Sequence, residues 1–442
     1  MSASLKLLRI EIRRNIGLWL FPFVIILVLY STAETLPRSI WLWPQTSLSI
    51  RDTMLLVGPL AAGLGAWSAD RNRRRGIEEL LVSTPRTATI RELGNWGATA
   101  AWINLGYAVA AVAMLLIAYL KGSSGTLILW PVVVGLFAVM ASSASGYAAG
   151  CYLPSRITAP IVAVAFYWAQ GIAAYNLWNN PASYLSPVTE LEYSVFWGVL
   201  PDIFAEQSMW LVGVTGVSLA AVILRGKASP KAAWIALLGA TIVAGIGAAT
   251  LLGTPVQVTQ DQKQEARIAY EPVCDRKGTV PVCVHPAYQA ALPKAATAIE
   301  AIAGPLTDLP GGPKRAEQES NGEVVLERNG TLSFYLSDSN IGNDNFSSEL
   351  AWALVKDSGS SRGEKETPLL NEAQSAIAGW LLQRSDIDVS SLNYATARGA
   401  DTETTAKARE RFARLPTDER KSWLRANYIK LRAGSISLED LP

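Results

Sequence analysis

The chain has 442 residues, of which 50% are hydrophobic and only 17% are charged. A formal net charge of +2 is too small for a protein that binds nucleic acid through its overall charge. The mean hydropathy of +0.20 argues against a wholly soluble protein. Polarity changes along the chain, because residues 1–252 are apolar whereas residues 253–442 have the composition of a water-soluble domain. We predict a polytopic α-helical membrane domain over 1–252 and an α+β domain over 253–442.

The N-terminal residues 1–15 carry several basic side chains beside an imperfect apolar helical face. They form either a short helix at the membrane surface or a charged flank of the first span. The apolar run 16–33 that follows is longer than the ~7–15 apolar residues of a signal peptide, and no small-residue cleavage site follows it. We therefore predict an uncleaved first span.

Six further apolar runs are long enough, or nearly so, to cross a membrane. With the first run they predict seven spans, at 16–33, 53–69, 95–120, 127–151, 157–177, 209–224 and 232–252. Small residues recur from Ser142 to Gly150, and such rows let membrane helices approach closely. The predicted spans contain only isolated polar residues, such as Asn104 and Gln170. Since intramembrane charge marks ion pathways, an ion-coupled transporter is disfavoured.

The stretch 70–92, between the second and third predicted spans, carries six arginines. Loops dense in Arg and Lys stay on the cytoplasmic side of a membrane. Arg156 and the basic loop 225–231 fall on the same side of the predicted topology. This orientation places the N-terminus in the cytoplasm and residues 253–442 outside the cell membrane.

The same topology makes two longer connections external. Residues 34–51 include Trp41 and Trp43, which we interpret as anchors at the membrane interface. Residues 178–207 mix prolines, carboxylates and aromatic side chains. This second connection is too polar to span and too apolar for a free loop, so we expect short re-entrant or interfacial helices there.

Two of the three cysteines, Cys274 and Cys283, lie in the predicted external domain and flank residues 275–282. β-rich runs adjoin them on both sides, and disulfides persist outside the cytoplasm. We predict a hairpin closed by a Cys274–Cys283 disulfide, with two free thiols as the alternative. His285 is the only histidine, so a two-His zinc site is excluded.

The rest of this domain alternates helical and strand patterns. Asn329-Gly330 predicts a second hairpin, between residues 323–326 and 331–336. Amphipathic helical patterns occur at 286–303, 348–356, 373–384, 404–413 and 417–431. These patterns indicate an independent α+β core.

The chain lacks several sequence motifs of catalytic sites. It has no phosphate-binding loop, no H-E-x-x-H pair and no G-x-S-x-G elbow. We therefore predict no catalytic residues, no bound metal and no cofactor on this chain. We interpret His285 as a structural residue at a strand end. Glu349, Asp386 and Asp388 are interpreted as parts of a solvated face.

The stretch 70–92 contains a compact pattern of a glycine, two glutamates, aliphatic residues and Thr-Pro. It resembles the segment after the second span of bacterial type-two ATP-binding-cassette exporter permeases, where G-T-x-E-x-L-x-x-T-P is typical. The matching residues are Gly76, Glu79, Leu81, Thr84 and Pro85. Ile77 replaces the usual Thr, and Arg73, Arg74 and Arg75 replace a commonly acidic run. The resemblance covers residues 1–224, and the seventh span and external domain depart from it.

The resemblance implies a transport subunit that works with a separate ATPase, which binds ATP and Mg²⁺, and that pairs with a second permease chain in a homodimer or heterodimer. The pattern would be a coupling helix seated on the ATPase. The residue types suit this role, because Glu78 and Glu79 complement a helix start, Leu80 and Leu81 offer an apolar knob, and Pro85 ends the helix. Arg74 and Arg75 would meet acidic partner surface or anionic lipid.

Three other interpretations of the sequence stay open. The stretch 70–92 could be an orienting loop without a partner. The whole chain could be a membrane-anchored sensor or receptor whose external domain binds a ligand or partner. It could also be an external enzyme carried on a membrane anchor.

Overall fold

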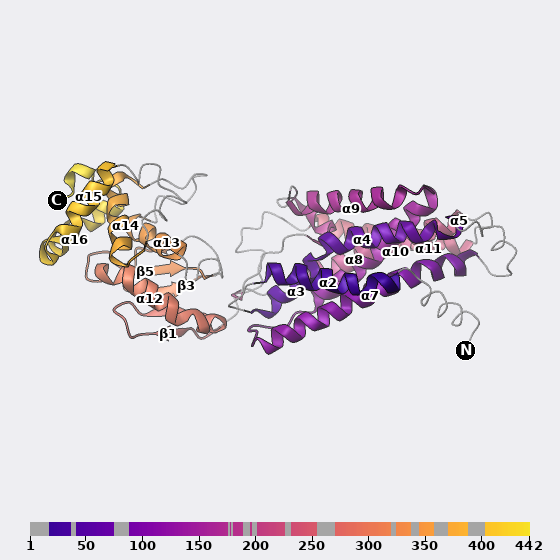
Figure 1. Ribbon diagram of the computed structural model, residues 1–442, viewed down its shortest axis with the longest axis horizontal. Coiled ribbons are helices and arrows are strands. Elements are labelled where there is room, and N and C mark those ends of the chain that lie inside the picture. Colours follow the sequence, from indigo (N-terminus) through magenta and orange to yellow (C-terminus); the bar gives the residue numbers. More distant parts are fainter. Residues whose placement is uncertain are drawn as a thin grey trace. The chain divides into compact units, whose positions relative to one another are not determined.

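The computed structural model of the chain describes residues 17–36, 41–74, 88–175, 177, 180–188, 195–196, 201–225, 231–253, 270–319, 324–336, 344–357, 370–387 and 403–442. The chain divides into two compact units, formed largely by residues 1–267 and 268–442 (Figure 1). We call them the helical unit and the sheet unit. The last helix of the helical unit ends at Gly253. The interfacial helix predicted for residues 1–15 lies outside the described residues.

The helical unit is built from long apolar helices. They are α2 (Gly17–Thr35), α3 (Trp43–Asp52), α4 (Met54–Ala69), α5 (Arg71–Arg74), α7 (Ala88–Leu120), α8 (Trp130–Tyr152), α9 (Thr158–Tyr175), α10 (Pro201–Leu224) and α11 (Lys231–Gly253), with a short 3-10 turn, η1 (Pro181–Leu185). Among the described residues, α2, α7, α8, α10 and α11 are long and apolar enough to cross a membrane. Helices suit this setting because they satisfy every backbone polar group internally.

The other two predicted spans are also helical, although α4 has only 16 residues and α9 has 18. The starts of two helices differ from prediction. α7 begins at Ala88 rather than at residue 95, and α10 begins at Pro201 rather than at residue 209. Arg91, Glu92 and Asp202 interrupt the apolar pattern there, but a helix propagates through polar side chains because each added residue makes a backbone hydrogen bond.

Residues 34–51, expected as an external connection, contain a helix instead. α3 packs against α7 and α8, and its residues from Thr46 to Arg51 are all buried. Only Thr53 separates α3 from α4. The two helices therefore follow one another along the unit, and Arg51 near the end of α3 is buried inside it.

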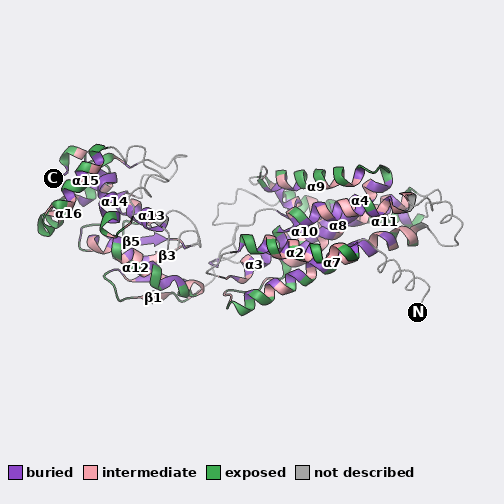
Figure 2. Cartoon of the chain, viewed as in Figure 1, coloured by how far each residue is buried: buried purple, intermediate pink, exposed green. Residues whose placement is uncertain are grey.

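The helices pack in a chain of neighbours around α4 and α8. α4 packs on α8 and α9, α8 also packs on α10 and α7, α2 runs along α7, and α11 runs along α10. The outer surfaces of α2, α9 and α11 are exposed (Figure 2). Large apolar side chains cover them, as Ile26, Trp168 and Ile235 show with exposures of 64%, 63% and 70%. Such surfaces suit contact with lipid rather than water.

Small residues bring the backbones of α4 and α8 into direct contact. A Cβ built at Gly146 would collide with the carbonyl oxygen of Ala62, and one at Gly150 would lie 2.5 Å from that of Ala66. From the α4 side, a Cβ at Gly65 would collide with the carbonyl oxygen of Ser143. The small-residue row predicted in the fourth span therefore faces α4, with no room for larger side chains.

We expect Gly146→Ala to destabilise the helical unit by roughly 1–3 kcal/mol, the usual cost of forcing an extra methyl group into a packed site. The methyl would push on the Ala62 carbonyl, so α4 and α8 would have to separate. The measurement is the unfolding midpoint of the purified chain titrated with dodecyl sulfate. Gly97→Ala in α7 is the matched control, because a Cβ there meets nothing within 4 Å. Equal effects of the two changes would contradict this packing.

The sheet unit contains a five-stranded mixed sheet with helices around it. The strands are β1 (Val273–Asp275), β2 (Val282–Val284), β3 (Arg315–Gln318), β4 (Val325–Leu326) and β5 (Thr331–Phe334), in the order β1-β2-β3-β5-β4. The β1–β2 and β4–β5 pairs are antiparallel hairpins, as predicted. β3 pairs in parallel with β2 and with β5, and it joins the hairpins into one sheet.

Helices cover this sheet and follow it in the chain. They are η2 (Pro286–Ala291), α12 (Leu292–Ala303), η3 (Gly304–Leu306), α13 (Asp344–Val355), α14 (Glu372–Arg384), α15 (Glu403–Arg414), α16 (Thr417–Arg432) and η6 (Leu438–Asp440). The five predicted helices are all present with shifted ends. α14 is the core helix, with every residue from Ala373 to Leu382 buried. Its Gln374 donates from Nε2 to the carbonyls of Val355 and Leu431, which ties α13 and α16 to α14.

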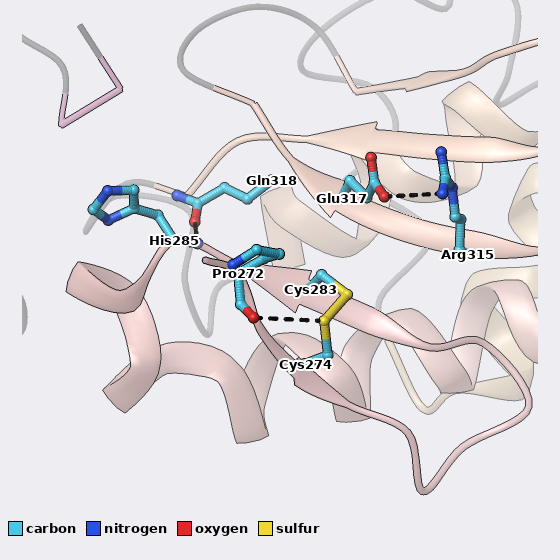
Figure 3. Close-up of a disulfide and its surroundings, with 7 residues drawn as sticks. All are labelled: Pro272, Cys274, Cys283, His285, Arg315, Glu317 and Gln318. Atoms are coloured by element: carbon cyan, nitrogen blue, oxygen red, sulfur yellow. Dashed lines mark hydrogen bonds and ion pairs between the residues drawn. A yellow bond between two sulfur atoms is a disulfide. The ribbon is translucent and has the colours of Figure 1, made fainter. Parts of the chain in front are cut away.

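A disulfide closes the first hairpin, as predicted. Cys274 and Cys283 are directly paired across β1 and β2 and are joined to one another (Figure 3). The Glu300 carboxylate of α12 accepts hydrogen bonds from the backbone N–H groups of Thr279 and Val280, at 2.9 and 3.2 Å. The hairpin is thus held at its loop by α12 and across its strands by the covalent bond.

Candidate functional site

The structure describes the two borders of the predicted coupling stretch 70–92. The first border is Asp70 with α5, and the second is the first turn of α7 from Ala88. Thirteen residues between them, 75–87, lie outside the described residues. The predicted contact residues in that part are Arg75, Gly76, Glu78, Glu79, Leu80, Leu81, Thr84 and Pro85.

Arg74, the one predicted contact residue that the structure describes, is bound to α4. Its Nη2 donates to the carbonyl oxygen of Trp67 at 2.6 Å, and its guanidinium lies 3.7 Å from the centre of the Trp67 ring. Nη1 is 3.5 Å from a carboxylate oxygen of Asp70. Asp70 is itself buried, so the pair is partly screened from water. Arg74 therefore fixes the first border of the stretch to the end of α4.

Glu92 fixes the second border to α8. The Tyr147 hydroxyl of α8 donates to Oε2 of Glu92 at 2.6 Å. Asn95, one turn further along α7, donates from Nδ2 to the Tyr147 hydroxyl at 3.1 Å and to the Ser68 carbonyl at 2.9 Å. Tyr147, Asn95 and Ser68 are all buried. Hydrogen bonds in such a setting are strong, so this network joins the ends of α7, α8 and α4.

The surroundings of this network bring in a fourth helix. Tyr147 packs with Cys151 of α8 and Val222 of α10. At the end of the unit that carries Glu92, hydrogen bonds therefore join α4, α7 and α8, and apolar packing joins α8 to α10.

Contacts of the described residues hold both borders of the stretch 70–92 to the helical unit. A thirteen-residue segment is anchored at one border to α4 and at the other to α7 and α8. Within the described part of the chain, no group of three or more His, Cys, Asp or Glu side chains could hold a metal ion.

The titratable groups singled out in the sheet unit have structural surroundings. His285 ends β2, as predicted: its Nδ1 accepts from the Ala287 N–H, and its backbone N–H donates to Gln318 (Figure 3). Burial lowers the pKa of the His285 imidazole. Glu349 differs from the predicted solvated face, because it is half-buried on α13 and accepts from the Tyr335 hydroxyl. Burial raises the pKa of its carboxyl group.

The remaining carboxylates give no site. Asp386 lies at the turn after α14 with a backbone φ of +56°. Asp388 lies outside the described residues. Neither residue joins a cluster that the structure shows.

The sequence did not identify Tyr147 as the partner of Glu92, or Asn95 as a partner of Tyr147. Both are polar residues within or beside apolar runs, which is a weak signal that something inside the unit pairs with them. The two polar residues that the sequence analysis did single out within the spans, Asn104 and Gln170, do not belong to this network. Asn104 donates to a carbonyl of its own helix, and Gln170 of α9 packs over Gly58 of α4.

No protein-family model, curated protein or solved structure matches the chain significantly. The resemblance to exporter permeases therefore rests on the pattern from Gly76 to Pro85 and on its place between membrane helices.

Replacing Tyr147 with Phe should destabilise the helical unit by roughly 1–3 kcal/mol, because Glu92 and Asn95 lose the hydroxyl between them. Equilibrium unfolding of the detergent-solubilised chain measures the change. Tyr107→Phe is the matched control: Tyr107 is equally buried, but its hydroxyl has no hydrogen-bond partner among the described residues. Loss of the Tyr107 hydroxyl should leave the stability of the helical unit unchanged or increase it. A greater loss for Tyr107→Phe than for Tyr147→Phe would refute the network.

Proposed function

We propose that this chain is the membrane-embedded permease subunit of an exporter driven by a separate ATP-binding-cassette ATPase. The observation that carries the proposal is the anchoring of both borders of the stretch 70–92 to the helices of the unit. A loop that only orients the chain needs no such anchors. The pattern from Gly76 to Pro85, which resembles that of type-two exporter permeases, lies between the anchored borders.

In this mechanism the ATPase binds ATP and Mg²⁺, and its closure moves the docked segment. Leu80 and Leu81 fill an apolar groove of the ATPase, and Glu78 and Glu79 stabilise the start of the docked helix. Arg74 passes the displacement to α4. Glu92 and Tyr147 pass it to α7 and α8. Packed helices respond by shifting between discrete arrangements rather than by bending continuously.

The proposed topology has seven spans, in which α4, extended by α3, and α9 join the five longest helices. The N-terminus lies in the cytoplasm and the sheet unit lies outside the cell membrane. The arginine content of the loops supports this orientation, because the stretch 70–92, placed in the cytoplasm, contains more arginine than any other loop. The Cys274–Cys283 disulfide supports it independently, because disulfides persist outside the cytoplasm. Two permease chains, identical or different, assemble in the bilayer with the ATPase.

Replacing Glu79, Leu80 and Leu81 together by Ala should weaken ATPase binding about tenfold or more, because buried apolar anchors dominate interfaces of this kind. The tagged full chain is purified in mild detergent from its own host, and the ATPase that co-purifies is quantified by mass spectrometry and by ATP turnover. Lys121→Ala, in the exposed turn between α7 and α8, is the control. Unchanged co-purification and turnover would contradict the coupling role. A fully functional chain without any ATPase would favour a membrane-anchored receptor.

The proposed orientation makes Cys274 and Cys283 reachable from outside the cell. In intact cells, a poorly permeant phosphine reductant followed by a charged maleimide should add two labels to the chain, counted by mass. Cys151 should stay unlabelled, because it is buried in α8. The double variant Cys274→Ser, Cys283→Ser is the control. Labelling of the pair only after permeabilisation would contradict the seven-span topology.

A further inference from the structure

An aromatic cluster in the sheet unit contains a residue from an earlier part of the chain. Val195 and Phe196 belong to the sheet unit, although in the sequence they lie between η1 and α10. Phe196 is only 2% exposed. Its ring centre lies 5.5 Å from that of Tyr270 and 5.2 Å from that of His285, both in edge-to-face arrangements. The chain between η1 and α10 therefore enters the sheet unit and is fixed there by a buried aromatic side chain.

The contacts of His285, the third member of the cluster, require its imidazole to be neutral. The ring centre of His285 lies 4.4 Å from that of Tyr270. Nδ1 accepts a hydrogen bond from the N–H of Ala287 at 3.0 Å, which caps the start of η2. In the imidazolium both ring nitrogens carry a proton, so neither can accept a hydrogen bond. Protonation of His285 would therefore break the cap of η2 and place a positive charge among buried rings.

The charges around His285 do not compensate for this cost. Burial lowers the pKa of the imidazole, and no charge of the described residues counters that shift. The His285 backbone N–H donates to the neutral side chain of Gln318 on β3 (Figure 3). The titratable side chains on the adjoining elements are Tyr270, Glu271, Asp275, Tyr288, Lys294, Glu300, Arg315, Glu317 and Glu319. Of these, Glu317 is paired with Arg315, and Glu300 binds the hairpin loop.

Proton binding to His285 and packing of Phe196 oppose one another. When the packed cluster disfavours the proton, the proton must disfavour the packed cluster by the same factor. The stability that neutral His285 gives to the cluster is fully present above its ordinary pKa of about 6.5. Because burial lowers the pKa, this stability is lost as the pH falls through the lowered value.

We propose that His285, Tyr270 and Phe196 form a proton-sensitive latch, in which protonation of His285 releases Val195 and Phe196 from the sheet unit. At neutral pH the latch is closed and fixes the chain ahead of α10. Acidification opens it. Since α10 begins at Pro201, opening removes a constraint directly before that helix. The latch is independent of the proposed exporter function, because it needs no ATPase and no substrate.

The first test titrates His285 directly in the purified full chain. His285 is the only histidine, so carbon-13 labelling of histidine gives a single imidazole signal in nuclear magnetic resonance. We expect Phe196→Ala to raise the pKa of His285 from its lowered value toward about 6.5, because the imidazole becomes accessible to water. Phe23→Ala, at a 50% exposed position of α2, should leave it unchanged. Equal pKa values in the wild type and Phe196→Ala would overturn the latch. A wild-type pKa above the ordinary value would do so too, because the rings would then stabilise the imidazolium.

The second test follows the release itself, by hydrogen exchange of the peptide that contains Val195 and Phe196. Rates corrected for the intrinsic effect of pH are compared at about pH 7.5 and about pH 5. Wild-type protection should fall on acidification, by about tenfold for each unit of pKa difference between Phe196→Ala and the wild type. His285→Asn keeps a capping acceptor but takes up no proton in this range, so its protection should not depend on pH. Unchanged protection in the wild type, or an equal loss in His285→Asn, would contradict the proposal.

Discussion

The backbone contact between α4 and α8 is the constraint on which the rest of the helical unit depends. Gly65, Gly146 and Gly150 lack side chains where the two helices meet, so carbonyl oxygens of the opposite helix lie where a Cβ would be. α9 then packs on α4, α7 and α10 pack on α8, and α11 packs on α10. In lipid no hydrophobic force draws helices together, so close packing of this kind contributes much of the stability of the bundle.

Polar groups inside this apolar packing have two different kinds of surroundings. Tyr147 lies in a network that joins three helices, whereas the hydroxyl of Tyr107 has no partner among the described residues. The first kind stabilises the fold and ties the stretch 70–92 to it. The second kind costs stability, because a buried hydroxyl without a partner has lost its hydrogen bonds to water. α7 carries groups of both kinds along one continuous helix.

Much of the architecture could be predicted because it depends on local patterns. Apolar runs marked the helices, and turn residues marked both hairpins of the sheet unit. The misses have physical causes: α7 and α10 begin in polar residues that hydropathy does not recognise as helical. β3 is the polar run Arg315–Gln318, and only its parallel neighbours make it a strand. The pattern from Gly76 to Pro85 stays a prediction. Asn95 and Tyr147, which meet in the structure, are 52 residues apart in the chain.

By itself, the sequence determined the membrane character of the first unit, the mixed nature of the second and the Cys274–Cys283 pairing. These properties follow from composition and from spacings of a few residues, which act locally. Only the tertiary structure decided that Arg51 is buried, that Glu92 meets Tyr147 and that Gly146 meets Ala62. Such contacts join residues distant in the chain. Packing sets them, and no local pattern encodes which helices become neighbours.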